Sequence, residues 1–407
     1  MTNILWGILG VAVIFVIAFI LSENKKKINV RTILGGLSIQ LIFAFIVLKW
    51  EVGRQAFQWI TNKVQDVINY ASAGKSFIFG SLTDPSQPTG FIFAFNVLTL
   101  IIFFSSLISV LYYLGIMQWI IRIIGGALSK LLGTSKAESM SAAANIFVGQ
   151  TEAPLVVKPY IKNMTNSELF AVMTGGLASV AGSVLFGYAA LGIPLDYLLA
   201  ASFMAAPAGL IMAKMLVPET EKPETLDELK MENDEDAANV IDAAAKGAST
   251  GLQLALNVGA MLLAFISLIA LINGILGGIG GFFGAENLTL ELILGYLFSP
   301  LAFLIGVPWD EALQAGSYIG QKLIVNEFVA YSSFAPEIEN LSDKTIAVIS
   351  FALCGFANLS SIAILLGGLG GLAPNRRQDI ARLGIRAVIA GTLANLLSAA
   401  VAGMFIF

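Results

Sequence analysis

The chain has 407 residues but no histidine and only one cysteine, Cys354. A single cysteine excludes an intrachain disulfide and leaves the redox compartment undefined. Without histidine, the protein lacks the commonest metal ligand and the side chain that ordinarily titrates near neutral pH. Any proton transfer at a functional site must therefore use carboxylates.

Charged residues are also scarce, at 12% of the chain against roughly 25% in soluble proteins. Hydrophobic residues make up 57%, and the mean hydropathy is +0.82. This composition predicts an integral membrane protein. The formal charge of −4 comes from residues concentrated in a few short connections, and it gives no support for nucleic-acid binding.

Apolar runs of about 20 residues can cross a membrane as helices. Basic residues such as Lys25, Arg31 and Arg376 separate several of these runs. The positive-inside rule places such connections in the cytoplasm and the N-terminus outside. We predict about eight spans, at residues 3–22, 32–50, 91–114, 168–190, 194–217, 251–277, 345–372 and 383–407.

Other segments are expected to lie outside the hydrocarbon. Residues 54–70 and 117–133 are amphipathic, which favours helices on the outer and inner membrane surfaces, respectively. Residues 219–246 are rich in charge and are expected to form a solvated cytoplasmic connector. The stretch 286–343 carries eight acids against one lysine, Lys322, which favours an outer location.

The predicted elements occur twice in the same order. Residues 117–133 lead into a polar segment with Glu152, and residues 289–306 lead into a polar segment with Glu327. In each copy, a long apolar run interrupted by small and polar residues follows, and then another span. Because the first copy starts inside and the second outside, we expect inverted repeats. Such repeats are typical of secondary transporters whose sites lie at mid-membrane.

Two segments, residues 137–161 and 311–334, are too polar for one span but long enough for two half-helices. We predict that they form re-entrant hairpins whose tips face each other, because irregular backbone within a membrane must be covered by protein or water. Residues 179–183 and 355–361 are predicted to unwind within the runs that follow. Four polar interruptions would then converge on one cavity.

Glu152 and Glu327 are the strongest functional candidates in this cavity. Hydrocarbon does not solvate carboxylates, so acids at membrane depth usually serve a function, whereas glycines there more often serve helix packing. Two carboxylates could act as acid and base, but the chain has no recognisable metal site or nucleophile elbow, so we predict no enzyme. A passive channel stays open as an alternative to a transporter.

Three motifs resemble the core motifs of the concentrative nucleoside transporter family. They are GQTEAPL at 149–155, NEFVAY at 326–331 and CGFANLSS at 354–361, and the resemblance covers essentially the whole chain. It implies a bacterial inner-membrane protein with eight spans that assembles as a homotrimer and imports nucleosides by an elevator mechanism.

The same resemblance implies a division of roles along the chain. A scaffold would hold the trimer, and two transport repeats would carry the substrate past it. The scaffold would comprise residues 1–115 and 247–285, the repeats residues 116–217 and 286–407, and the connector residues 218–246.

Residue roles also follow from the motif match. The nucleobase of uridine, cytidine, adenosine or another nucleoside would meet the first hairpin, and the ribose would meet the second hairpin and the break after it. A carboxylate and an amide suit ribose hydroxyls, because unpaired polar groups in a dry site are costly. The nucleobase contacts would be Gln150, Thr151 and Glu152, the apolar contacts Val184 and Phe356, and the ribose contacts Glu327, Asn358 and Ser361.

In sodium-coupled members of the family, the ion sits between the first hairpin tip and the first break. The positions that correspond here are Asn145 and Ser179, through side-chain oxygens, and Val148 and Val180, through backbone carbonyls. Because a hard cation prefers oxygen ligands, we favour sodium as the coupling ion, without an organic cofactor. Proton coupling through one of the acids is the alternative. Preference for purines or pyrimidines depends on cavity shape, which the sequence does not fix.

Overall fold

The computed structural model describes residues 2–84, 86–87, 90–225, 237–285 and 287–406, and this part of the chain is built from helices without a strand. Seven of the described helices are long and apolar enough to cross a membrane, or eight if the bent pair α12 and α13 counts as one span. The all-α integral membrane fold predicted from the composition is confirmed.

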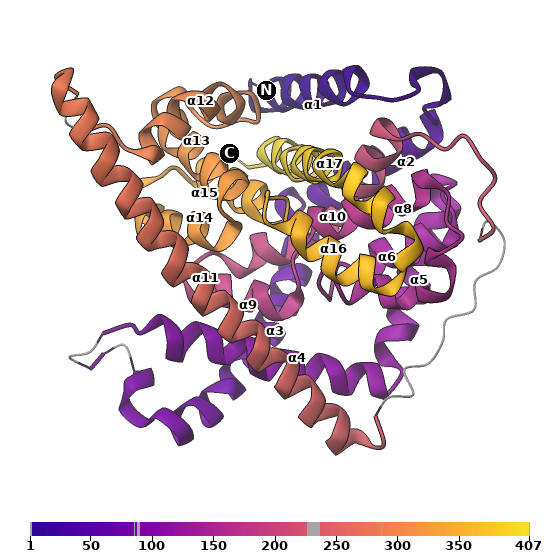
Figure 1. Ribbon diagram of the computed structural model, residues 1–407, viewed down its shortest axis with the longest axis horizontal. Coiled ribbons are helices and arrows are strands. Elements are labelled where there is room, and N and C mark those ends of the chain that lie inside the picture. Colours follow the sequence, from indigo (N-terminus) through magenta and orange to yellow (C-terminus); the bar gives the residue numbers. More distant parts are fainter. Residues whose placement is uncertain (1, 85, 88–89, 226–236, 286, 407) are drawn as a thin grey trace.

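The N-terminal part contains two spans, a long amphipathic helix and a third span (Figure 1). The amphipathic helix α3 is longer at both ends than the predicted segment 54–70. Its C-cap is Gly80, whose φ of 57° suits glycine because it has no Cβ. The bounds are α1 Thr2–Ile20, η1 Lys25–Lys27, α2 Val30–Ala44, η2 Phe45–Lys49, α3 Glu51–Phe79, η3 Gly80–Thr83, η4 Ala94–Leu98 and α4 Thr99–Tyr113.

The first repeat begins with the amphipathic helix α5 and continues with a hairpin, a broken span and an unbroken span. The hairpin consists of α6, an irregular tip and the short helices η5 and α7, as predicted for residues 137–161. The bounds are α5 Ile116–Leu132, α6 Lys136–Ala144, η5 Ala153–Val157, α7 Lys158–Ile161, α8 Asn166–Ala178, α9 Gly182–Ala190 and α10 Leu195–Leu216.

The second repeat has the same order of elements. α12 and α13 meet at a bend of 116°, and α13 and α14 form the second predicted hairpin. The predicted span 345–372 is divided into α15 and α16, as expected from its polar interruption. The bounds are α12 Leu290–Leu304, α13 Trp309–Ile324, α14 Glu327–Phe334, η6 Ala335–Asn340, α15 Asp343–Leu353, α16 Ser361–Leu372, η7 Pro374–Arg376 and α17 Arg377–Gly403.

The long helix α11 (Val240–Phe282) runs along one side of the molecule and crosses α4 (Figure 1). Small residues allow the two backbones to approach. A Cβ placed on Gly247 would lie 2.5 Å from the Ser109 Cβ, and one placed on Gly251 would lie 2.7 Å from the Ser105 Cβ. The crossing of α4 and α11 therefore depends on these glycines.

The helix α11 begins earlier than the sequence predicted, at Val240, so the last residues of the expected connector are helical. The Asn239 side chain caps the helix by accepting hydrogen bonds from the backbone N–H groups of Ile241 and Asp242, both at 3.0 Å. Residues 226–236 of the connector lie outside the described residues, as does Glu286 of the acidic stretch.

The spans differ strongly in burial. Within the span Asn166–Ala190, which comprises α8 and α9, 89% of an apolar 18-residue window is buried inside the protein, against 11% of such a window in α11. The helices α8, α10 and α17 pack against one another and form the core of the two repeats. The apolar surface of α11 therefore faces outward, toward lipid or another protein.

A buried ion pair organises one end of the first repeat. Lys214 Nζ lies 2.6 Å from Glu138 Oε2 and 3.4 Å from Glu219 Oε2. Glu138 also accepts a hydrogen bond from the Ser135 N–H, which closes the capping box at the start of α6. Glu219, expected to be a solvated connector residue, therefore contributes to the packing of this end.

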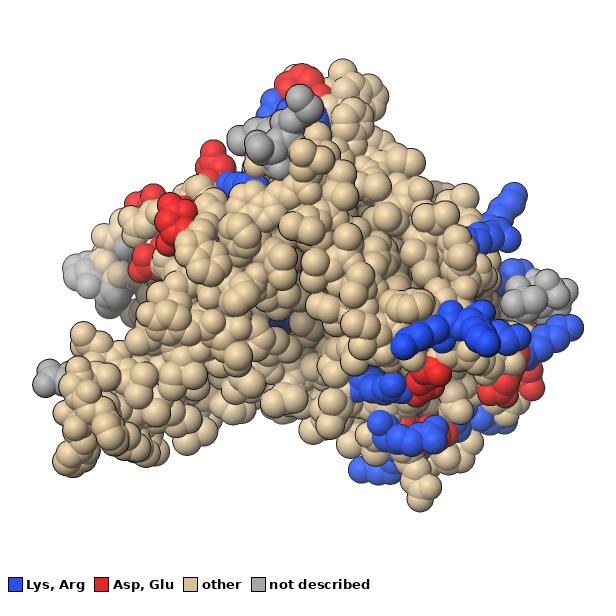
Figure 2. All heavy atoms as spheres, turned by 90° about the horizontal axis from the view of Figure 1, so that it is seen from above, with Lys and Arg blue, Asp and Glu red and all other residues tan. Residues whose placement is uncertain are grey.

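On the face that Figure 2 shows, charged side chains gather at the right-hand end and along the top and upper left, and a broad uncharged area lies between them. Blue basic groups dominate the right-hand end, where Figure 1 places α2 and α5. Such a distribution is typical of a membrane protein. Lys322, the one lysine of the acidic stretch 286–343, is 2% exposed and lies inside the protein.

Candidate functional site

Two helix breaks meet inside the repeats. One separates α8 from α9, and the other separates α15 from α16. The two unwound segments are joined directly, because the Phe356 N–H donates a hydrogen bond to the Ser179 carbonyl at 3.0 Å. Sequence segments about half the chain apart thus share one backbone contact at the predicted point of convergence.

The tip of the first hairpin reaches both breaks. The Gly182 N–H, at the start of α9, donates to the Phe147 carbonyl at 3.0 Å. A Cβ on Gly176 would lie 2.8 Å from the Gln150 Cβ, so this glycine leaves room for the tip. Gln150 Nε2 lies 3.5 Å from Ser361 Oγ, at the long end of hydrogen-bond range, and this contact links the tip to the second repeat.

Glu327 begins α14 at the tip of the second hairpin and is 5% exposed. Its Oε1 accepts a hydrogen bond from the Tyr188 hydroxyl at 3.1 Å, and its Oε2 accepts one from Asn358 Nδ2 at 3.1 Å. A carboxylate can accept about four hydrogen bonds. Acceptor capacity therefore remains on this carboxylate for the hydroxyls of a ligand.

Asn358 connects this carboxylate with the start of α16. Its Oδ1 accepts hydrogen bonds from Ser360 Oγ at 2.7 Å, from the Ser361 N–H at 2.9 Å and from Ser361 Oγ at 3.1 Å. These bonds fix the amide so that its nitrogen points at Glu327. A continuous polar chain thus runs from Gln150 through Ser361 and Asn358 to Glu327.

The two predicted acids have different surroundings. Glu327 is buried, whereas Glu152 is exposed. The Glu152 side chain lies over Gly149, where a Cβ would stand 2.6 Å from Glu152 Oε2. The half-buried Thr151 packs against α16, where a Cβ on Gly368 would lie 2.6 Å from Thr151 Cγ2. At the tip of the first hairpin, Gln150 forms a hydrogen bond with Ser361 of the second repeat.

One of the two predicted apolar contacts lies at each of the joined breaks. Val184 is in the first turn of α9 and is buried, whereas Phe356 is in the second break and is half-buried. Both are held by backbone hydrogen bonds, from the Val184 N–H to the Ala181 carbonyl and from the Phe356 N–H to the Ser179 carbonyl, each at 3.0 Å.

The four predicted cation ligands, Asn145, Val148, Ser179 and Val180, are all buried. Among the described residues, Asn145 Oδ1 has no hydrogen-bond partner. Ser179 Oγ donates its proton to the Gly175 carbonyl at 3.0 Å, so its lone pairs stay available. A Cβ on Gly175 would lie 3.3 Å from Asn145 Nδ2, which places both side chains beside the same glycine. Unpaired buried oxygens of this kind suit a hard cation.

Three buried polar residues near the site were not identified from the sequence. Tyr188 lies in an apolar run, Asn395 lies in the last span, and Lys322 stood out only as the single lysine of an acidic stretch. For two of them the sequence contained one indication, because polar groups are costly at membrane depth. Asn395 lies in the last predicted span, and Lys322 lies in the second predicted hairpin. Their partners lie far away in sequence.

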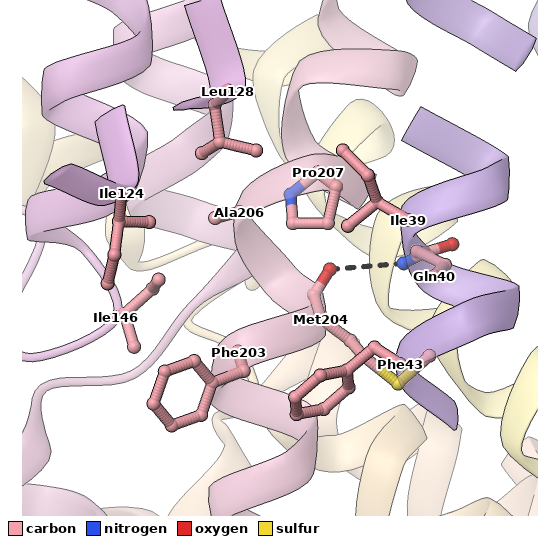
Figure 3. A pocket seen from close by; sticks show the side chains of 10 residues that line it. All are labelled: Ile39, Gln40, Phe43, Ile124, Leu128, Ile146, Phe203, Met204, Ala206 and Pro207. Atoms are coloured by element: carbon pink, nitrogen blue, oxygen red, sulfur yellow. Dashed lines mark hydrogen bonds between the residues drawn. The ribbon is translucent and has the colours of Figure 1, made fainter. Parts of the chain in front are cut away.

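A separate cavity of about 190 Å³ lies beside the first hairpin, between α2, α5 and α10 (Figure 3). Its lining is apolar except for Gln40, whose Nε2 donates to the Met204 carbonyl at 3.0 Å. Ile146, next to Asn145, is the lining residue from the hairpin. The predicted substrate contacts lie outside this cavity.

Three family models match consecutive parts of the chain. They describe the N-terminus of Na+ dependent nucleoside transporters at residues 9–82, nucleoside recognition at residues 94–195, and the C-terminus of Na+ dependent nucleoside transporters at residues 197–403.

The chain is also similar to individual proteins along nearly its whole length. It is 66% identical to the uncharacterized transporter YutK of Bacillus subtilis, over 99% of this chain and 100% of YutK. It is 54% identical to the nucleoside permease NupC of Helicobacter pylori, over 99% of this chain and 98% of NupC.

Solved structures of CNTnw share this fold. The inward-facing substrate-bound structure matches with a TM-score of 0.94 at 58% identity, covering 99% of this chain and 98% of CNTnw. A CNTnw variant in an outward-facing state matches with a TM-score of 0.95 at 57% identity, covering 100% of this chain and 98% of the variant. The chain therefore belongs to the concentrative nucleoside transporter family.

Proposed function

We propose that this protein imports nucleosides by symport with sodium. The observation that carries the proposal is the polar chain from Gln150 through Ser361 and Asn358 to Glu327, which joins both hairpins and the second break. Buried hydrogen-bonding groups that converge from several segments inside a membrane protein suit a small polar solute.

Glu327 and Asn358 are proposed to bind the ribose. The carboxylate has two positioned donors, Tyr188 and Asn358, and spare acceptor sites for ribose hydroxyls. Ser361 completes the ribose side, Val184 and Phe356 provide apolar contact, and Gln150, Thr151 and Glu152 meet the nucleobase. The exposure of Glu152 is compatible with a contact through water.

Sodium is proposed to bind at Asn145, Val148, Ser179 and Val180. The unpaired Asn145 Oδ1 supports this assignment, and two of the matching family models describe Na+ dependent transporters. A proton carried by one of the acids is the alternative, and a passive channel is a weaker one. In the symport mechanism the cation is cargo and is released with the nucleoside.

We further propose an elevator motion, with the repeats moving past a scaffold. The scaffold expected from the resemblance included residues 1–115, but the contacts favour a smaller one. Gln40 in α2 donates to the Met204 carbonyl in α10 and to Ser398 in α17, at 3.0 and 2.9 Å. Trp6 in α1 donates to the Phe303 carbonyl at 2.7 Å. We propose that α1 and α2 travel with the repeats and that α3, α4 and α11 form the scaffold.

We also propose that the protein is a homotrimer in a bacterial inner membrane, with its N-terminus outside. The outward-facing apolar surface of α11 offers an area for subunit contact, and the basic end of the molecule suits the cytoplasmic side. Mass measurement in detergent tests the trimer, and a value for one subunit would reject it. The orientation is tested by replacing Asn3 with cysteine and labelling that cysteine from the outside.

Transport by the purified protein in proteoliposomes tests the central proposal. Labelled uridine should accumulate above its external concentration only when an inward sodium gradient is imposed. Uptake that persists in choline and follows a pH gradient would favour proton coupling. Equilibration that needs no gradient would favour a channel.

The Glu327→Gln variant tests the site. Loss of the charged acceptor should weaken uridine binding by about 1.5–3 kcal/mol, or roughly 10- to 150-fold, with little change in melting temperature. Glu339→Gln is the matched control, because Glu339 is an exposed acid in the same repeat. Normal uptake by Glu327→Gln would contradict the assignment.

A further inference from the structure

A buried lysine and a buried asparagine connect the two helix breaks. Lys322 lies in the last turn of α13 and Asn395 lies within α17, and each is 2% exposed. Lys322 Nζ donates to Asn395 Oδ1 at 2.6 Å and to the Ala352 carbonyl at 2.8 Å. Both acceptors are uncharged. An ammonium group is costly to bury when its hydrogen-bond acceptors are neutral, which makes a functional role the first hypothesis.

Asn395 extends this arrangement to the other break. Its Nδ2 donates to the Ala178 carbonyl at 2.6 Å and to the Cys354 carbonyl at 3.0 Å. Ala178 is the last residue of α8, and Cys354 follows the last residue of α15. Carbonyls at helix C-termini lack donors within the helix and carry partial negative charge. Lys322 and Asn395 together therefore satisfy the ends of both broken helices.

Close packing holds α17 in place against the two breaks. A Cβ on Gly355 would overlap the amide of Asn395. A Cβ on Gly391, in α17, would lie 2.9 Å from the Leu177 Cβ in the last turn of α8 and 3.1 Å from the Ala357 Cβ of the second break. These glycines let the Asn395 amide reach both helix ends at once.

The two capped ends lead directly into the two proposed ligand sites. Ala178 precedes Ser179, which belongs to the cation set, and Cys354 is followed two residues later by Phe356, which belongs to the nucleoside set. The Phe356 N–H also donates to the Ser179 carbonyl. The two sites therefore share one backbone frame whose ends are held by Lys322 and Asn395.

We propose that Lys322 and Asn395 are positioning residues that couple cation binding to nucleoside binding. They hold the two breaks in register, so that a cation at Ser179 fixes the backbone that presents Phe356 to the nucleoside. This inference rests on the proposed sodium symport. The inference concerns the coupling factor, which is the factor by which one bound ligand raises the affinity for the other. This factor is the same whichever ligand binds first. The direct contacts of each ligand are a separate matter.

The test measures that factor on the full-length protein purified in detergent. Uridine is titrated by calorimetry in sodium chloride and in choline chloride, and the ratio of the two dissociation constants is the coupling factor. In the wild type we expect a factor of roughly 5 to 150, which is the usual range for coupled sites. A merely structural role would weaken binding in both salts equally and leave the ratio unchanged.

Two variants should lower the ratio. Asn395→Asp keeps an acceptor for Lys322 but removes the two N–H donors to the Ala178 and Cys354 carbonyls. Lys322→Met keeps an unbranched side chain that is one atom shorter, and it removes the ammonium group with its two hydrogen bonds. In each, the factor should fall to within about twofold of one. The matched control is Thr392→Val, because the Thr392 hydroxyl donates only within its own helix, to the Val388 carbonyl at 2.9 Å.

The outcomes separate this inference from the proposed function. An unchanged ratio in either folded variant would overturn the coupling role. If one variant fails to elute as folded protein in size-exclusion chromatography, the ratio measured for the other variant tests the coupling role. Equal uridine affinity in sodium and choline for the wild type would instead contradict sodium symport, and with it the basis of the inference.

Discussion

The Tyr188 hydroxyl donates a hydrogen bond to Glu327 Oε1 at 3.1 Å, and the two residues belong to different repeats. The tyrosine ring is held by two aromatic neighbours, with centroid distances of 4.7 Å to Phe328 and 4.5 Å to Tyr331. The first repeat therefore contributes a rigid donor to the carboxylate of the second. Charge-assisted hydrogen bonds of this kind are stronger than neutral ones.

The Tyr188→Phe variant should weaken uridine binding by about 1 kcal/mol, or about fivefold, because Glu327 loses one of its positioned donors. The phenyl ring keeps the aromatic contacts, so the melting temperature should stay near that of the wild type. Calorimetric titration of uridine checks the affinity. Tyr318→Phe serves as the control, since the Tyr318 hydroxyl accepts only from Gln314 on its own helix, at 2.9 Å. Equal affinities for wild type and Tyr188→Phe would argue against this role.

The Asn145→Ala variant should lose the dependence of uridine uptake on sodium, because it removes the unpaired Oδ1 proposed as a cation ligand. Uptake in proteoliposomes with sodium or choline outside measures the effect. Asn96→Ala is the matched control, because Asn96 is also buried and also donates to the carbonyl four residues earlier, as Asn145 does. A sodium response that survives in Asn145→Ala would rule out this ligand.

The Gly368→Ala variant should weaken nucleoside binding several-fold, because the new methyl group would lie 2.6 Å from Thr151 Cγ2 and would displace the tip of the first hairpin. Gly367→Ala, at the neighbouring position of α16, should bind normally because no atom lies within 4 Å of the added carbon. Titration of both variants with uridine makes the comparison. Identical affinities would show that Thr151 can move without consequence for the site.

The Lys214→Met variant should be destabilised by about 3–5 kcal/mol, because it leaves the carboxylate of Glu138 buried without its cation. Lys214 and Glu138 are both almost fully buried and lie 2.6 Å apart. Adding Glu138→Gln to Lys214→Met should restore part of the loss. Thermal unfolding in detergent compares the stabilities of the wild type, Lys214→Met and the double variant. A double variant no more stable than Lys214→Met would contradict the pairing.

Local chemistry explains why much of the fold could be predicted. Span positions follow from runs of apolar residues, which a membrane requires whatever the neighbouring helices are. The breaks before Gly182 and Ser361 follow from small and polar residues inside such runs. The bounds of α3 and α11 were predicted less well, because helix ends depend on single caps such as Gly80 and Asn239.

The residues of the candidate site could be predicted from the sequence only in part. Glu327 stood out because an acid at membrane depth is unusual, and Asn358 and Ser361 came from the motif that surrounds them. The sequence did not distinguish the buried Glu327 from the exposed Glu152. Burial of a side chain at a hairpin tip depends on which remote segment covers it.

The sequence alone therefore determined the membrane class, the two repeats, the hairpins, the breaks and the family. Each of these features can be predicted from composition or from short contiguous motifs. Only the tertiary structure decided the partners of Tyr188, Lys322 and Asn395. Their hydrogen bonds join residues 30 to 217 positions apart. Such partners are set by the packing of whole helices, which no local pattern specifies.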